Sequence, residues 1–340
     1  MTDRRLKMLL PCAPDAARGN GTTAQRMSCE LERRGYAVEM VDVAEVDVHS
    51  PGEADADLLI ALHAAHSGPT AQALASAWDI PYVVLFTGTD LNGQPSAEAC
   101  AAAEHAAACV ALGTAAGRRA RDIYPEARDR VTVIPQAVAP MPFRPGMKLP
   151  ETAPEVSAEA PVMLMIAALR EIKDPLRAIT ALGPMLTEHP EMQLWFAGPV
   201  LEEATGKAVE EACAKHEFAH YLGPVERDDL LPLLRRATVV LSTSRSEGGA
   251  PNALLEAVST GRPVLASSIP AHREFPGAEH CFRDDAEMRK RLRKILEDPD
   301  RAAVVNRKLQ EIVRQTHSPA AEGLAWDRLL RAIPSGSAKS

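Results

Sequence analysis

Short apolar runs alternate with amphipathic or alanine-rich stretches along most of this sequence, and that alternation limits the chain to few folds. The runs contain much Val, Leu and Ile without strict polar alternation, which is typical of parallel strands covered on both faces. The stretches between them, such as residues 96–107, are typical of crossover helices. The pattern predicts one doubly wound parallel sheet in the first part of the chain. Its strands are expected within residues 6–12, 37–43, 56–62, 82–88, 109–113 and 131–136.

A second series of the same kind begins after residues 140–161, a Pro- and Glu-rich stretch that is typical of a linker. Strands are expected within residues 161–169, 193–198, 219–225, 237–244 and 262–269, and helices over 174–188, 201–216, 228–236 and most of 285–333. A chain of 340 residues also exceeds one comfortable core.

We therefore predict an α/β protein with two Rossmann-like, doubly wound parallel-sheet domains that face a cleft. The first domain is expected over residues 1–145 and the second over 146–317. Residues 318–340 are expected to form a C-terminal helix, a candidate to pack back on the first domain, and a flexible tail.

Composition and charge argue against several classes of function. The net charge of −8 disfavours nucleic acid or an anionic membrane as the main partner. The six cysteines are scattered without the spacing of a zinc site, so we expect reduced thiols, no metal and no other cofactor. Pro11 and Pro14 interrupt the short apolar run near the start, and no apolar segment reaches the length of a membrane span. The sequence predicts a cytoplasmic protein without stable membrane association, and it leaves the oligomeric state open.

A glycine-rich segment, Gly248-Gly249-Ala250-Pro251-Asn252, follows one of the predicted strands and lies between two carboxylates, Glu247 and Glu256. Ligands bind at the carboxyl ends of strands in open α/β sheets. Glycines allow close backbone approach, and a helix start offers N–H donors to phosphate or hydroxyl oxygens. Carboxylates accept hydrogen bonds from vicinal hydroxyls, so we expect Glu247 to bind a sugar and Glu256 a ribose. A plain turn into a helix would explain the same pattern.

In each predicted domain, one basic segment follows the first strand. The segment from Arg18 through Gly19, Asn20 and Thr23 to Arg26 is a glycine turn opening a helix, suited to an anion or to an ordinary tight turn. Arg170 and Lys173 suit a diphosphate leaving group. In the structural alternative, Asp174-Pro175 begins a helix with Asp174 as its N-cap, and the basic residues are solvated.

Polar residues also follow two middle strands of the first predicted domain. His63 ends one strand, and Thr87-Gly88-Thr89-Asp90 ends the next. A lone histidine in such a place is more often structural than catalytic. His63 and His66 have no third ligand spaced to complete a metal site.

Together these segments resemble glycosyltransferase family 4 of the GT-B fold over nearly the whole chain. The resemblance rests on Ser244 through Ala257 and on Gly261-Arg262-Pro263-Val264. It implies a nucleotide-sugar donor held mainly by the second domain, an acceptor on the first, and no metal requirement.

The sequence is more closely similar to the selenosugar synthases of selenoneine biosynthesis, a subgroup that joins selenophosphate to the sugar of a UDP-sugar. This narrower resemblance rests on Gly19-Asn20 with Thr23-Ala24 and Arg26, Ala61-Leu62-His63, Thr87-Gly88-Thr89-Asp90-Leu91, Val133-Ile134-Pro135-Gln136, and Leu169-Arg170 with Lys173-Asp174-Pro175-Leu176-Arg177. It implies transfer of a sugar, expected to come from UDP-N-acetylglucosamine, to selenophosphate, which would form a 1-selenosugar.

The resemblance also implies three groups of site residues. The expected catalytic residues are Arg170, Lys173 and Glu247. The expected donor-binding residues are Gly19, Gly248, Gly249, Ala250 and Glu256. The expected acceptor-binding residues are Asn20, Thr23, Arg26, His63, Thr87 and Thr89.

Three departures from the family pattern bear on these roles. Eight residues lie between Glu247 and Glu256, where most members have seven. Ala167-Ala168 stands where many members have Gly-Arg, and we expect Arg170 to supply that charge. Thr87 stands where members acting on alcohols often carry a histidine, and selenophosphate, already anionic, needs binding rather than deprotonation.

Other functions stay open at this point. They are a family 4 transferase with an alcohol, sugar or lipid acceptor, a UDP-sugar epimerase, and a nucleotide-sugar binding protein without catalysis. A dinucleotide dehydrogenase is disfavoured, because no G-x-G-x-x-G turn precedes an acid by about twenty residues.

Overall fold

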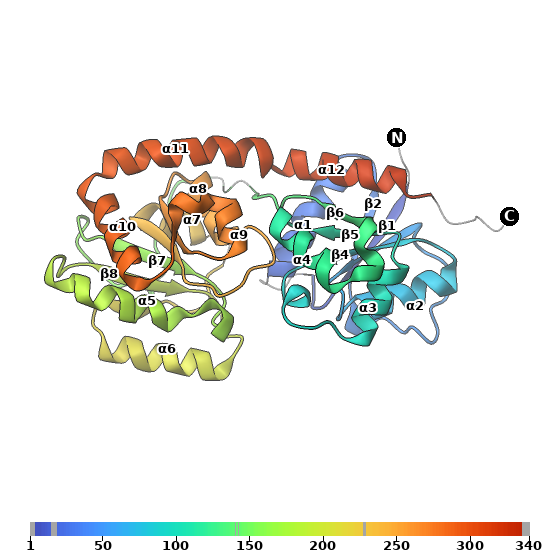
Figure 1. Cartoon of the computed structure of the whole chain (residues 1–340), viewed down its shortest axis with the longest axis horizontal. Coiled ribbons are helices and arrows are strands. Elements are labelled where there is room, and N and C mark those ends of the chain that lie inside the picture. Colours follow the sequence, from blue (N-terminus) through green and yellow to red (C-terminus); the bar gives the residue numbers. More distant parts are fainter. Residues whose placement is uncertain (1–3, 15–18, 140, 142, 227–228, 335–340) are drawn as a thin grey trace. The chain divides into compact units, whose positions relative to one another are not determined.

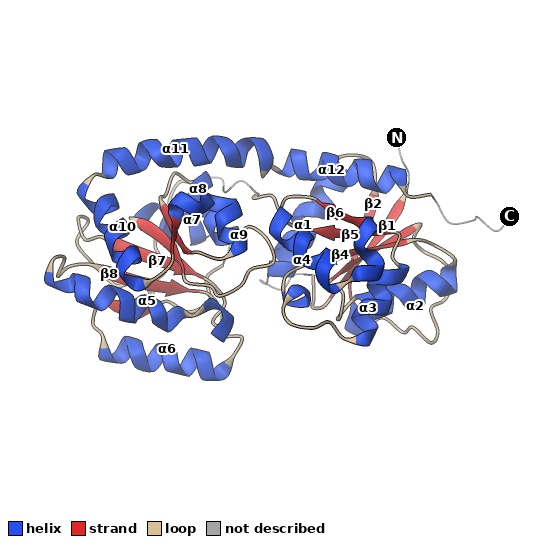
Figure 2. Cartoon of the chain, viewed as in Figure 1, coloured by secondary structure: helices blue, strands red, loops and turns tan. Residues whose placement is uncertain are grey.

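The computed structural model describes residues 4–14, 19–139, 141, 143–226 and 229–334. The chain divides into two compact units (Figure 1). The first unit combines residues 1–139, 248–250 and 316–340, and the second combines residues 140–247 and 251–315. Each unit contains one parallel sheet of six strands, with helices around the strands (Figure 2).

The first unit contains a sheet in the order β2-β1-β3-β4-β5-β6. All residues of β3 and β4 are buried, as expected for strands covered on both faces. The elements are β1 (Arg5–Leu10), α1 (Gly19–Glu32), β2 (Ala37–Asp42), β3 (Leu58–Leu62), α2 (Gly68–Trp78), β4 (Tyr82–Phe86), α3 (Ala97–His105), β5 (Ala108–Ala111), α4 (Thr114–Ile123), β6 (Val131–Val133) and α12 (Pro319–Ala332).

The second unit contains a sheet in the order β12-β11-β10-β7-β8-β9. Its elements are β7 (Val162–Ile166), α5 (Pro175–Leu182), β8 (Gln193–Ala197), α6 (Glu203–Lys215), β9 (Ala219–Tyr221), α7 (Leu230–Arg236), β10 (Val239–Ser242), α8 (Asn252–Ser259), β11 (Val264–Ser267), α9 (Pro270–His272), β12 (Cys281–Phe282), α10 (Asp285–Glu297) and α11 (Pro299–Thr316).

Every strand that the apolar runs predict is present, and each is shorter than its run. The prediction missed β12, a strand of two residues that carries too little sequence pattern to be seen. The glycine turn expected before the first helix is wrong in part, because α1 already begins at Gly19 and includes Asn20 and Thr23. The expected tail, residues 335–340, lies outside the described residues.

The C-terminal helix α12 packs in the core of the first unit. Trp326 and Leu330 of α12 are fully buried in one apolar cluster with Met27 and Leu31 of α1. Burying an aromatic or aliphatic side chain of this size contributes about 1.5–3 kcal/mol. The fold of the first unit therefore includes a helix that lies far away in the sequence.

Candidate functional site

Strand order in the second unit brings several predicted segments to one edge of its sheet. Strands β7, β10 and β11 are direct neighbours and run parallel. Parallel strands end at the same edge, so the segments that follow them lie together there. These segments are residues 167–174, 243–247 and 268–272.

Lys173 and Glu247 form an ion pair at this edge. Lys173 Nζ donates to Glu247 Oε1 at 2.5 Å, and the two side chains are only 15% and 12% exposed. Burial raises the pKa of the Glu247 carboxyl, but the charge of Lys173 and hydrogen bonds from Lys173 and Ser244 outweigh burial and hold this pKa below its usual value. Glu247 is therefore an ionised carboxylate, able to accept hydrogen bonds from hydroxyl groups.

Contacts with the end of β10 hold the segment that carries Lys173. Thr243 Oγ1 lies 2.9 Å from the carbonyl oxygen of Lys173 and 2.8 Å from that of Asp174. Arg245 donates its backbone N–H to the Ile172 carbonyl at 2.8 Å. Thr243 directly follows β10 and Arg245 lies two residues further on, so the end of this strand positions the lysine.

Asp174 occupies the N-cap position of α5, as the structural alternative predicted. Pro175 is the first residue of α5, as the sequence suggested, but the Asp174 side chain makes no capping hydrogen bond. Asp174 has a φ of 47°, and its Oδ2 instead accepts from Arg245 Nε at 3.2 Å. The carboxylate pairs with a guanidinium that the local sequence pattern does not show.

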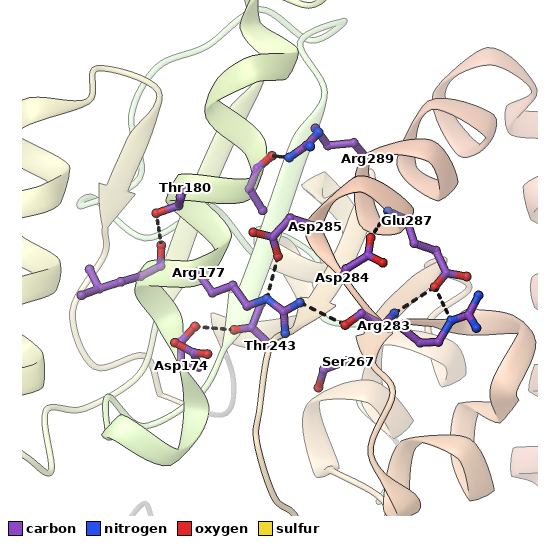
Figure 3. A network of polar contacts seen from close by, with 12 residues as sticks. Asp174, Arg177, Thr180, Thr243, Ser267, Arg283, Asp284, Asp285, Glu287 and Arg289 are labelled. Carbon is purple, nitrogen blue, oxygen red and sulfur yellow. Dashed lines mark hydrogen bonds and ion pairs between the residues drawn. The ribbon is translucent and has the colours of Figure 1, made fainter.

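Figure 3 shows the polar contacts that fix α5 beside β12 and α10. Arg177 Nε donates to Asp285 Oδ1 at 2.8 Å, and Arg177 Nη2 donates to the Arg283 carbonyl at 3.5 Å. The Arg177 guanidinium also lies 5.2 Å from the centre of the Phe282 ring. Arg177 therefore anchors the helix that directly follows the Lys173 segment.

Arg170 lies at the start of the short 3₁₀ helix Glu171–Lys173. Its Nε is buried and has no hydrogen-bond partner within the residues that the structure describes. A buried N–H without a partner is costly, and an anionic oxygen would satisfy it with a charge-assisted hydrogen bond. Arg170 is therefore suited to hold a phosphate group.

Sequence reasoning missed a buried cluster of hydroxyls around His272. The His272 side chain is fully buried, with Nδ1 2.8 Å from the Ser267 carbonyl oxygen and Nε2 3.4 Å from Ser242 Oγ. Ser242 Oγ lies 3.2 Å from Ser244 Oγ. The available signal was the run of hydroxyl residues at the ends of two predicted strands, of which only Ser244 belonged to the predicted motif.

Gly248 and Gly249 group with the first unit by their contacts. Gly249 forms a parallel bridge with Leu112, and a Cβ on Gly249 would lie 2.8 Å from Leu112 Cβ. A Cβ on Gly248 would lie 2.2 Å from Gly88 Cα. Backbone packing alone therefore requires glycine at both positions. The donor contacts expected of Gly248, Gly249 and Ala250 stay a prediction.

Glu256 lies inside α8, which begins at Asn252, and is only 5% exposed. The order of the two acids is as expected, with Glu247 before this helix and Glu256 within it. The ribose contact expected of Glu256 stays a prediction.

In the first unit, the loops after β3 and β4 share hydrogen bonds. These strands are neighbours in the sheet, so His63 and Thr89 meet although 26 residues separate them. His63 Nε2 lies 2.8 Å from Thr89 Oγ1. The Asp90 carboxylate accepts the backbone N–H groups of Ala64, at 3.0 Å, and Gly88, at 2.9 Å.

The ring of His63 has a defined role in its own loop. Its Nδ1 accepts the backbone N–H groups of Ala65 and His66, both at 3.2 Å. Two donors at Nδ1 leave the proton on Nε2, which then donates to Thr89. Burial, the first cause, and the nearby His66 hold the pKa of His63 below its usual value. His63 is therefore a neutral hydrogen-bond donor.

The predicted acceptor-binding residues of α1 differ from one another in exposure and in partners. Asn20 is half-buried in the first turn, and Thr23 is buried. Arg26 is also buried, and its Nε and Nη2 donate to the two carboxylate oxygens of Glu322 at 2.7 and 2.8 Å. The guanidinium thus already has an anionic partner within the unit, and Arg18 lies outside the described residues.

Two kinds of feature are absent from the part of the chain that the structure describes. No helix there is long and apolar enough to cross a membrane. No group of three or more His, Cys, Asp and Glu side chains there is arranged to hold a metal ion.

Comparison with known proteins agrees with this arrangement. Residues 160–298 match the family described as glycosyl transferases group 1. The chain is 25% identical to glycosyltransferase 1 domain-containing protein 1 of Xenopus tropicalis over 287 residues, which are 78% of this chain and 80% of the relative.

Solved structures show the same fold. Sucrose-phosphate synthase from Thermosynechococcus elongatus superposes with a TM-score of 0.76 at 15% identity, covering 96% of this chain and 98% of the other. HepE of Anabaena in complex with UDP-glucose superposes with a TM-score of 0.73 at 16% identity, covering 97% of this chain and 100% of the other. The fold is GT-B. Together with the matched region, it places the chain in the class of glycosyltransferases.

Proposed function

We propose that this protein transfers a sugar from a UDP-sugar, UDP-N-acetylglucosamine in the first instance, to selenophosphate. The selenium atom would attack the anomeric carbon, the bond from that carbon to the UDP oxygen would break, and UDP would leave with the electron pair. The immediate product would be a sugar with a phosphoryl group on selenium. Attack of water on its phosphorus would then break the Se–P bond and release phosphate and the 1-selenosugar. The observation that carries the donor half of this proposal is the Lys173–Glu247 ion pair beside the unpartnered Nε of Arg170.

The residues at the sheet edge of the second unit support a nucleotide-diphosphate donor. In this proposal Lys173 and Arg170 stabilise the charge that develops on the departing diphosphate. Glu247 accepts hydrogen bonds from the sugar, and Glu256 from the ribose. The structural neighbour HepE was solved with UDP-glucose, which supports a UDP-sugar as the donor.

The acceptor half of the proposal rests on the sequence resemblance and on the loop chemistry of the first unit. His63 holds Thr89 as described, and Thr89 itself is exposed. Because the Thr89 hydroxyl accepts a hydrogen bond from His63 Nε2, its own O–H can donate a hydrogen bond to an anionic oxygen. Asn20, Thr23, Thr87 and Thr89 are retained as acceptor residues. Arg26 is left out, because Glu322 already neutralises it.

The first experiment incubates the purified protein anaerobically with UDP-N-acetylglucosamine and selenophosphate. Release of UDP and the mass of any selenium-containing sugar are followed. A selenosugar would support both halves of the proposal. UDP release without selenium incorporation would overturn the selenophosphate acceptor and indicate hydrolysis or a different acceptor. A changed sugar in the donor incubated alone, seen by NMR, would indicate an epimerase instead.

Two variants test the assigned cations. Lys173→Ala and Arg170→Ala should each lower turnover about 10²- to 10³-fold, because each removes one charge from the developing diphosphate. Steady-state kinetics with the UDP-sugar measures this. Lys207→Ala is the matched control, since Lys207 is a solvent-exposed cation on α6 of the same unit. Unchanged turnover in either site variant would remove that residue from the proposed mechanism.

A further inference from the structure

His272 and Glu247 are the two ends of one buried chain of polar groups in the second unit. A hydrogen bond from Ser244 helps to hold the pKa of Glu247 below its usual value. Ser244 Oγ lies 3.2 Å from Ser242 Oγ, which lies 3.4 Å from His272 Nε2. Ser242, Ser244 and His272 are 8%, 1% and 0% exposed, and the Glu247 side chain is 12% exposed. Glu247 is therefore the most exposed member of this chain.

The protons available to the chain can be counted. The Ser267 carbonyl can only accept, so His272 Nδ1 carries a proton. Ionised Glu247 can only accept, so Ser244 donates to it. The single proton of Ser242 then goes either to Ser244 Oγ or to His272 Nε2. With a neutral imidazole, one of those two contacts has no proton, and the chain is one proton short.

One additional proton completes the chain in either direction. If His272 holds it, Nε2 donates to Ser242, Ser242 to Ser244, and Ser244 to the Glu247 carboxylate. If Glu247 holds it, every hydrogen bond in the chain reverses and Ser242 donates to Nε2. The two hydroxyls can therefore move one proton between the acid and the imidazole without moving a heavy atom.

We propose that His272 is a positioning residue that shares a proton with Glu247 through the Ser242 and Ser244 hydroxyls, and that a UDP-sugar binds together with this proton. The inference rests on the proposed function, in which Lys173 turns from Glu247 towards the diphosphate. Loss of that cation leaves Glu247 without its partner, and a proton on the chain restores the balance of charge. The completed chain then fixes the orientation of the Glu247 carboxylate.

The charges around His272 support this coupling. Burial, the first cause, lowers the pKa of His272, the carboxylate of Glu247 raises it, and the ammonium of Lys173 lowers it. The charge of Glu247 acts on the imidazole from the loop after β10 and that of Lys173 from the segment after β7, while the Ser267 carbonyl of β11 contacts Nδ1. Movement of Lys173 away from Glu247 therefore favours protonation of the chain.

The test measures proton uptake on binding of UDP-N-acetylglucosamine, by calorimetry at pH 6.5–7 in buffers that differ in ionisation enthalpy. The diphosphate of this probe is a diester, so the probe does not titrate in this range. We expect the observed binding enthalpy to rise with the buffer's ionisation enthalpy, which indicates uptake. Ser242→Ala, which breaks the chain while keeping both ends, and His272→Asn should reduce the slope towards zero.

Ser267→Ala is the matched control. Its hydroxyl donates to the Ser244 carbonyl and also lies 3.3 Å from His272 Nδ1, but it is not one of the two hydroxyls between Glu247 and His272 Nε2. A purely structural role would change the slope in Ser267→Ala as much as in Ser242→Ala. A zero slope in the wild type, or an unchanged slope in both chain variants, would overturn the inference while the UDP-sugar donor stood.

A second measurement needs no ligand and separates the inference from the proposed function. NMR titration of the His272 imidazole in the whole protein should give a lower pKa in Glu247→Gln than in the wild type, because the carboxylate no longer favours the charged ring. An unchanged titration would show that the chain does not couple the two groups, whether or not a UDP-sugar binds.

Discussion

At the scale of single residues, His63 shows how a backbone position and a side chain are selected together. His63 has a φ of 97°, a region that most side chains avoid and that asparagine tolerates better than most. The strain is held by the ring, whose Nδ1 accepts two backbone N–H groups of the same loop. Strain of this kind costs about 1–3 kcal/mol and is often found at functional sites.

Substitution of His63 tests both its positive φ and the hydrogen bonds that its ring accepts. Asparagine accepts positive φ, and its Oδ1 can accept the N–H two residues on, as Nδ1 of His63 does now. We expect His63→Asn to be about 1–3 kcal/mol more stable than His63→Ala, measured by urea unfolding. His66→Ala keeps the backbone N–H and serves as the control. Equal stability of the Asn and Ala variants would contradict the assigned role of Nδ1.

At the scale of elements, α12 shows how a distant segment completes a domain. Its Glu322 is paired with Arg26 of α1, and the two side chains are 1% and 4% exposed. Glu322 Oε1 also accepts the backbone N–H of Ala137 at 3.3 Å. The carboxylate thus joins α12, α1 and the segment after β6, at positions where apolar residues would also pack.

Removal of one partner from this pair should be costly. Arg26→Met leaves an uncompensated buried carboxylate, so we expect a loss of about 3–5 kcal/mol in the free energy of unfolding. The double variant Arg26→Met with Glu322→Leu should recover part of it, because no charge remains buried. Arg331→Met is the control, since Arg331 is an exposed member of an ion pair on the same helix. A stable Arg26→Met protein would show that the pair is not structural.

At the scale of the whole molecule, buried histidines make stability depend on pH. The pKa values of His63, His220, His272 and His280 all lie below the usual value, in each case with burial as the first cause. Below about pH 6.5 the unfolded chain therefore binds more protons than the folded chain. Stability from these groups is complete above that pH and decreases as pH falls below it.

The lowered pKa values of these histidines predict that the protein loses stability in mild acid, at a pH above the range in which carboxylates titrate. Urea unfolding should give a lower free energy of unfolding at pH 5.5 than at pH 7.5. Replacing His272 by Gln, which cannot become charged, should reduce the difference between the two pH values. An equal or higher stability at pH 5.5 would contradict the assigned burial of these rings.

Much of the fold was predictable from local pattern. Buried parallel strands need continuous apolar runs, so all strands but the two-residue β12 could be located. The candidate segments could be placed at strand ends for the same reason. The roles of individual residues were harder to predict. Arg26 is of a residue type that often binds anionic ligands, yet its partner is Glu322, which lies 296 residues away in the chain.

The sequence by itself determined which segments become strands and helices and which polar residues stand at strand ends, because periodicity and burial act over a few neighbouring residues. Tertiary structure alone decided which of those ends are neighbours. Sheet order places β7 between β8 and β10, and only then do Lys173 and Glu247 meet. The neighbouring strands β10 and β11 of this sheet likewise join His272 to Ser242, and the neighbouring strands β3 and β4 of the other sheet join His63 to Thr89. Such pairs form by strand and helix packing between distant segments, and no local pattern encodes them.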